Sequence, residues 1–182
     1  KERARITPRL IAEKGFTSVA VEADWPDAYR VNRYVRNQHD DKNAEQALGG
    51  FKRFPTWMWR NTDVVQFVEW LRKHNDALPP QAIKTGFYGL DLYSLFTSLH
   101  EVLHYLEKID PEAALHARAR FACFDHFDQD SERYGYATGF GFSPSCEDVV
   151  VAQLQALHAR ADEYMRQDGR EARDAFFYAQ QN

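Results

Sequence analysis

Carboxylates that end two short apolar runs are the residues best placed to do chemistry. Glu22 and Asp24 close the β-branched run at 16–23, and Asp91 closes the run at 85–90. Ligands of open parallel sheets bind outside the carboxyl ends of the strands, so these acids would face one cleft. We therefore expect a functional role for Glu22 and substrate contacts from Asp24 and Asp91. In the competing interpretation such acids only cap the following helix, as Asp91 would for a helix beginning at Leu92.

Residues 100–104 read His-Glu-Val-Leu-His and match the helical H-E-x-x-H motif of zinc peptidases. Such a helix would supply two imidazole ligands one turn apart and a glutamate as general base. Helical geometry, however, turns both histidines away from the apolar stripe, and neither a third histidine nor a ligand glutamate follows at the required spacing. We therefore predict no metal and no cofactor, and a zinc metallopeptidase is the weakest alternative.

Aromatic and basic side chains in two other segments could line a substrate pocket. Trp57, Trp59 and Arg60 lie in an aromatic run, where rings offer rigid apolar area and an arginine can hold an anion. His126 follows Asp125 and is a further candidate. The structural alternative places both tryptophans in the core and leaves His126 packed among aromatics. The chain has no nucleophile elbow, Walker loop or dinucleotide fingerprint, which disfavours the usual serine hydrolases and nucleotide enzymes.

Two strands among about seven helices must position these residues, which defines a helix-rich α/β fold class with a parallel-type sheet. Gly15 would stop the first helix, which either begins at Pro8 or is kinked there. Asn61 and Asp110 would cap later helices, and Ser145 with an acid three residues on resembles a capping box. Helices are thus expected up to residue 14, over 27–36, 44–48, 61–74, 92–109, 110–127 and 145–166, and from 169 onward, with an irregular loop at 131–144.

The composition is that of a soluble globular protein, with 44% hydrophobic and 27% charged residues. A formal net charge of -4 gives no electrostatic reason to bind nucleic acid or an anionic membrane surface. No apolar run is long enough to span a membrane. Two cysteines, Cys123 and Cys146, are too few for a disulfide framework. We favour buried thiols over a disulfide, and with them a cytoplasmic location.

Several segments together resemble the erythromycin esterase family, and most closely its bacterial branch that is sometimes labelled succinoglycan biosynthesis protein. The resemblance covers essentially all of the chain and is carried by segments 2–6, 13–17, 21–28, 54–63, 87–94 and 123–127. It implies an α/β/α core with large helical additions and a metal-independent hydrolysis of an ester or lactone. We accordingly expect a single domain over 1–182, with core pieces at 1–36 and 84–109 and helical additions at 37–83 and 110–182.

The resemblance also implies companions for Glu22. In the family a histidine within a Gly-Glu-x-x-His segment is held to activate water, and an arginine shortly after it and a glutamate at the end of the next strand share its site. By motif position these two residues are Arg3 and Glu22. The histidine segment would lie just before Lys1, and another beyond Asn182, so the chain alone is expected to be inactive. A small-molecule substrate is the partner implied. The alternative is a non-catalytic or carbohydrate-pathway binding protein of the same fold.

Overall fold

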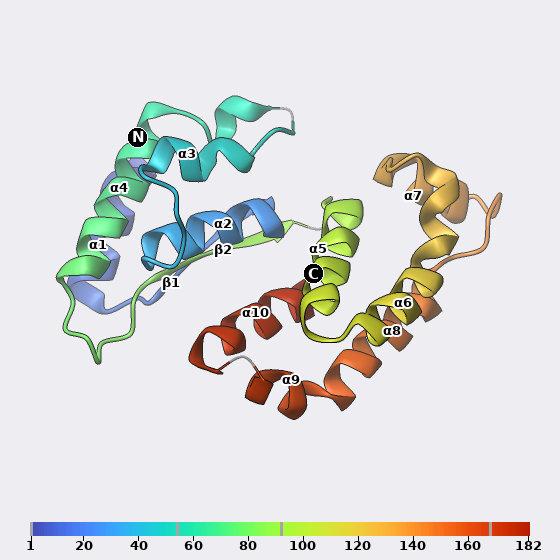
Figure 1. The fold of residues 1–182 in the computed structure, drawn as a ribbon. Helices are drawn as coiled ribbons and strands as arrows, with labels where there is room; N and C mark the ends of the chain where they lie inside the picture. Colours follow the sequence, from blue (N-terminus) through green and yellow to red (C-terminus); the bar gives the residue numbers. More distant parts are fainter. Residues whose placement is uncertain (1, 54, 92, 168) are drawn as a thin grey trace. The chain divides into compact units, whose positions relative to one another are not determined.

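The computed structural model describes residues 2–53, 55–91, 93–167 and 169–182, without the side chains of 169–174. These residues form ten α-helices and one two-stranded parallel sheet, which confirms the helix-rich α/β fold class (Figure 1). The chain divides into two compact units, residues 1–92 and 93–182. The single domain expected from the sequence stays a prediction.

The first unit contains both strands. Its elements are α1 (Glu2–Lys14), β1 (Ser18–Asp24), α2 (Trp25–Val35), α3 (Ala44–Ala47), the 3-10 helices η1 (Leu48–Gly50) and η2 (Thr56–Met58), α4 (Thr62–Ala77) and β2 (Gly86–Asp91). In Figure 1, α2 lies along the sheet and α1 runs beside α4. Two expected helix ends are confirmed. Gly15 adopts a left-handed φ of 70° and donates to the Ile11 carbonyl, and the Asn61 side chain accepts from the Val64 N–H.

Pro8 does not begin the first helix, because α1 runs through it from Glu2 to Lys14. Proline lacks the N–H that would bond to the carbonyl four residues back. That carbonyl belongs to Ala4, and the Thr7 hydroxyl donates to the carbonyl of the preceding residue, Arg3, over 2.9 Å. Of the two readings offered by the sequence, the longer helix with an internal proline is the one observed.

One face of the sheet packs into the core of the first unit. Val19, Val21 and Phe87 point into a cluster that α2 and α4 complete with Val31, Val35, Val68 and Leu71. This burial fixes the strands, since roughly 25 cal/mol are gained per Å² of apolar surface removed from water. The opposite face is open: Ala20, Glu22 and Leu90 are exposed. The side chain of Glu22 is therefore held by a rigid strand yet remains accessible.

The second unit is helical. It consists of α5 (Leu95–Ile109), α6 (Pro111–Phe121), the 3-10 helix η3 (Ala122–Phe127), α7 (Ser131–Gly139), α8 (Glu147–Ala159), α9 (Ala161–Gln167) and α10 (Gly169–Gln181). The apolar stripe of α5 packs on α6 and α10, with Val102, Leu106, Ala117 and Leu157 in the core. As expected, the Asp110 carboxylate caps α6 by accepting from the Ala113 N–H.

Three expectations for the second unit are wrong. Residues 131–139 form the helix α7 rather than a loop, because the Asp130 carboxylate caps its first turn and the Tyr134 ring packs against Phe124 and Phe127. The helix expected at 145–166 begins at Glu147, without the capping box. It also breaks at Arg160, whose guanidinium pairs with Asp110 and Glu163. The start of α5 expected at Leu92 lies outside the described residues.

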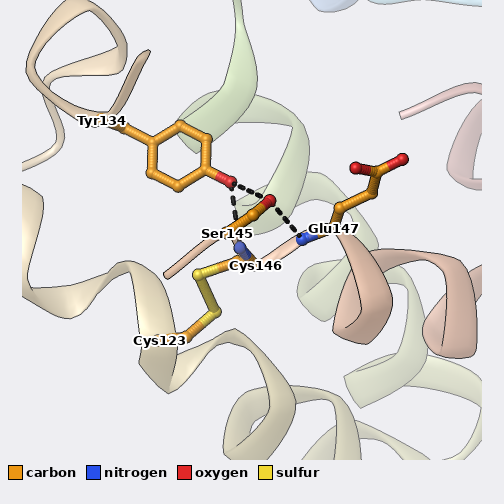
Figure 2. Close-up of a disulfide and its surroundings, with 5 residues drawn as sticks. All are labelled: Cys123, Tyr134, Ser145, Cys146 and Glu147. Atoms are coloured by element: carbon orange, nitrogen blue, oxygen red, sulfur yellow. Dashed lines mark hydrogen bonds between the residues drawn. A yellow bond between two sulfur atoms is a disulfide. The ribbon is translucent and has the colours of Figure 1, made fainter. Parts of the chain in front are cut away.

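A disulfide joins Cys123 in η3 to Cys146 at the start of α8, with the two Cα atoms 6.2 Å apart (Figure 2). The preference for buried thiols is therefore wrong, and the cytoplasmic location that relied on it stays a prediction. Tyr134 supports the same junction, because its hydroxyl accepts from the Cys146 N–H and lies 3.4 Å from the Ser145 hydroxyl. The packing of η3, α7 and α8 brings the two sulfurs together, which their separation in the sequence does not indicate.

Replacing Cys146 by Ser is expected to lower the free energy of unfolding by about 2–3 kcal/mol under non-reducing conditions. The cross-link restricts the unfolded chain, and the variant removes that restriction with little change in side-chain volume. Urea denaturation followed by circular dichroism measures the loss. Excess reductant should bring the unaltered protein to the same stability. Equal stability of both proteins without reductant would mean that the cross-link contributes nothing.

Among the described residues, no helix is long and apolar enough to cross a membrane.

Candidate functional site

The two strands end side by side with a carboxylate each. Parallel pairing sets Ser18 opposite Gly86, and after an irregularity beyond Val21 it sets Asp24 opposite Asp91. Because parallel strands present their carboxyl ends at one edge, both acids reach the same place, as the sequence predicted. The strands approach closely there: a Cβ on Gly89 would lie 2.4 Å from the Ala23 carbonyl oxygen. Only glycine fits this position without displacing a strand.

Arg53 bridges the two aspartates. Its Nε and one terminal nitrogen bond to the two oxygens of Asp24 at 3.1 and 3.3 Å, and the same terminal nitrogen bonds to Asp91 at 2.8 Å. The side chains of Asp24 and Asp91 are each 12% exposed, whereas that of Arg53 is 49% exposed. The arrangement is thus a sheltered pair of carboxylates covered by a guanidinium that reaches solvent.

Two acids at this edge have raised pKa values. Burial raises the pKa of the Asp24 carboxyl, although Arg53 opposes the shift. Burial also raises the pKa of Asp27 in the first turn of α2, and the charge of Asp24 raises it further. The charges of Arg30, Lys52 and Arg53 oppose the shift at Asp27, so this edge holds a cluster of acids and cations. Such a cluster can accept hydrogen bonds from hydroxyl groups of a ligand and can donate through the guanidinium.

Removing the arginine tests this electrostatic balance. Arg53→Met should lower the free energy of unfolding by about 1–2 kcal/mol at neutral pH, since two sheltered carboxylates lose their charged partner. Without Arg53 the folded-state pKa of Asp24 rises further. A carboxyl group whose pKa is higher in the folded state stabilises the fold fully at a pH below its pKa in the unfolded state. This stabilisation is lost as the pH rises through its pKa in the folded state.

The deficit of Arg53→Met should accordingly be largest near neutral pH and shrink in acid. Urea denaturation across the acid-to-neutral range measures it. Arg60→Met is the matched control, because Arg60 is an exposed arginine whose side chain makes no hydrogen bond or ion pair among the described residues. A deficit that does not depend on pH would contradict the bridging role.

Glu22 lies two residues before Asp24 on β1, and its exposed side chain makes no hydrogen bond or ion pair among the described residues. Arg3 lies in the first turn of α1 and is also exposed. No contact joins its guanidinium to Glu22 within the described part of the chain. The structure thus gathers Asp24 and Asp91, while the association of Arg3 with Glu22 stays a prediction.

Of the remaining candidates, three belong to the first unit and one to the second. Trp57 in η2 is 67% exposed, and Trp59 packs against Phe51 at the edge of the core with 6.0 Å between ring centroids. Arg60 is exposed and closes a turn through its backbone, and Phe54 of the same run lies outside the described residues. His126 is exposed on η3 of the second unit. Contacts of these four side chains with substrate stay predictions.

The H-E-x-x-H segment lies within α5, with His100 and His104 both exposed. Among the described residues, no three histidine, cysteine, aspartate or glutamate side chains gather closely enough to hold a metal ion.

Sequence reasoning missed Arg53 and Asp27. Arg53 meets its partners across 29 and 38 residues of chain, so no local pattern marks it. Asp27 reads as an ordinary acid in the first turn of a helix. The observation that could have pointed to Arg53 is that two sheltered acids at a strand edge need a cation, and Arg53 begins the aromatic segment that follows the polar residues 37–50.

Comparison with known proteins gives two kinds of likeness. The family model described as erythromycin esterase matches residues 11–182. A solved structure described as a succinoglycan biosynthesis protein matches with a TM-score of 0.65 and 21% sequence identity. The match covers 97% of this chain and 40% of the chain in that structure. A second structure, of a Bacillus cereus protein, has a TM-score of 0.62 and 18% identity, with coverage of 97% and 41%.

At this identity the two structures show the fold alone, and the chain spans about two fifths of their length. The family match takes in both strands, the aspartate pair with Arg53, and the whole helical unit. It also bears out the resemblance found in the sequence motifs. The chain therefore belongs to the erythromycin esterase family.

Proposed function

We propose that this chain is part of a hydrolase that directs water onto a carboxylic ester or a macrolide lactone, with the carboxyl ends of β1 and β2 as its share of the active site. The observation that carries the proposal is the edge where Arg53 joins Asp24 and Asp91 beside the accessible Glu22. The membership of the erythromycin esterase family supports the reaction class.

In this proposal Glu22 orients a histidine that removes a proton from the attacking water. A carboxylate that accepts from one ring nitrogen raises the basicity of the other. Residues 1–92 contain two histidines, and both have other contacts: His39 pairs with Asp41 at 2.8 Å, and His74 stacks on Trp70. The base is accordingly assigned to another part of the whole protein. Arg3 would pair with the acid or stabilise the oxyanion that develops.

The aspartates and Arg53 would bind the polar part of the substrate. Carboxylates accept from hydroxyl groups, and a guanidinium donates to carbonyl or hydroxyl oxygens. Arg53 is half exposed, so it can shift toward a ligand without leaving both aspartates. This division of roles assigns binding to the sheltered aspartates and proton transfer to the surroundings of Glu22.

The whole protein should be assayed with p-nitrophenyl esters and with a macrolide lactone, measuring phenolate release and addition of one water to the lactone by mass spectrometry. Hydrolysis of either substrate that persists after metal chelation supports the proposal. Absence of hydrolysis of both would reject it.

A binding protein is the second candidate, favoured by the exposed ring of Trp57. Exposed tryptophans stack on the apolar faces of sugars, and one similar structure is described as a succinoglycan biosynthesis protein. Calorimetric titration with an oligosaccharide tests this function. Binding that disappears in Trp57→Ala, together with no ester turnover, would favour the binding protein over the hydrolase.

A further inference from the structure

A pocket of about 400 Å³ opens between α5 and the α6–η3 segment of the second unit. Its volume lies in the range of roughly 300–1,000 Å³ typical of small-molecule sites. The floor is formed by aromatic and aliphatic side chains, Phe96, Leu99, Leu103, Phe121 and Phe124, and the rim by polar ones, His100, Asp125, Asp128 and Gln129. An apolar floor with a few polar groups at its mouth is the usual make-up of a binding site.

Helical spacing builds the two walls. Phe96, Leu99 and Leu103 recur at three- and four-residue intervals on α5, and the facing segment repeats the pattern from Phe121 to Asp128. Phe96 meets Phe124 edge to face, with ring centroids 6.2 Å apart. This aromatic pair defines the bottom of the pocket.

The η3 wall is held firmly. Phe124 contacts the Tyr134 ring at 5.1 Å, and the adjoining Cys123 is bonded to Cys146, as Figure 2 shows. Because the wall is tied from two sides, a ligand would not have to order it, and preorganised sites bind more tightly for the same contacts.

Within the described part of the chain, one of the two rim carboxylates has a charged partner and the other has none. The Asp128 carboxylate is paired with Arg133. Asp125 is exposed and makes no hydrogen bond or ion pair among the described residues. Its charge therefore lies next to an apolar, aromatic floor. A cation bound there would form an ion pair with the carboxylate and cation–π contacts with the phenylalanine rings.

We propose that this pocket binds a small molecule that combines an apolar group with a protonated amine. The apolar group lies on Phe96, Phe121 and Phe124, and the ammonium pairs with Asp125. The site differs in place and chemistry from the strand edge, and it does not depend on the proposed hydrolysis.

Three probes that share one apolar group test the proposal on the whole protein: 4-phenylbutylamine, 4-phenylbutanol and 4-phenylbutyrate. Titration calorimetry at about pH 8 keeps the amine of the probe protonated. We expect the amine to bind about three- to tenfold more tightly than the alcohol, as for a partly exposed ion pair, and the acid to bind most weakly. Leu99→Trp should abolish the binding of all three by filling the pocket.

Asp125→Asn should remove the preference for the amine and leave the affinity for the alcohol unchanged. Asp40→Asn, which removes an equal charge from an exposed position in the first unit, should change neither. Because Asp125 is exposed, its variant tests the proposal even if Leu99→Trp misfolds. Equal affinity for the three probes, an amine preference that survives Asp125→Asn, or no binding at all would overturn the proposal.

Discussion

Replacing Glu22 by Gln in the whole protein is expected to lower kcat/KM for ester hydrolysis by about 100-fold or more. Glutamine keeps the size of the side chain but loses the charge that would orient and strengthen a histidine base. Glu22 is exposed and has no partner among the described residues, so the change should leave the fold intact. Loss of activity without loss of stability is the signature of a catalytic role.

Steady-state hydrolysis of a p-nitrophenyl ester and urea denaturation, run on the same preparations, measure the two quantities. Asp40→Asn serves as the control, because it removes one exposed acid of the same unit. If Arg3 and Glu22 act on one histidine, the double variant with Arg3→Gln should lose less than the product of the two single losses. Full activity in Glu22→Gln would exclude Glu22 from the mechanism.

Replacing Asn75 by Ala is expected to lower the free energy of unfolding by about 3–4 kcal/mol, the largest effect on stability that we predict. The Asn75 side chain is completely buried. Its amide donates to the carbonyls of Val35 and Thr85, each at 2.9 Å, and its carbonyl oxygen accepts from the Thr85 N–H at 2.8 Å. One side chain thus joins the ends of α2 and α4 to the residue that leads into β2.

Alanine would leave three buried backbone groups without partners, and each such group costs about 1–3 kcal/mol before relaxation. Asn61→Ala at the other end of α4 is the matched control. It removes a helix cap at the surface and should cost about 1 kcal/mol. Chemical denaturation followed by tryptophan fluorescence compares the two variants. A loss for Asn75→Ala no larger than that for Asn61→Ala would show that Asn75 does not hold the strand in register.

The stability and the proposed activity are linked through β2. Asn75 fixes the entry of the strand, and Asp91 at its exit bonds to Arg53. A loosened β2 would therefore disturb the aspartate pair as well. Asn75→Ala should consequently weaken substrate binding, whereas Glu22→Gln should affect the chemical step.

Local chemistry made much of the fold predictable from the sequence. Gly15 ends α1, Asn61 and Asp110 cap α4 and α6, and two short apolar runs give both strands, because each signal acts over a few residues. The same short runs placed Asp24 and Asp91 at one edge. The grouped motifs also indicated the family, which the match over residues 11–182 bears out.

The tertiary structure decided what depends on distant parts of the chain. Arg53 reaches Asp24 and Asp91 across long stretches of sequence, the cysteines pair only when η3 meets α8, and α7 is stabilised by rings from η3. Side-chain propensity favoured a loop at 131–139, yet packing of Tyr134 outweighed it. The sequence by itself therefore determined the elements and the acids at their ends. Only packing decided which cation those acids would share, because contacts between distant segments depend on how all of the helices fit together.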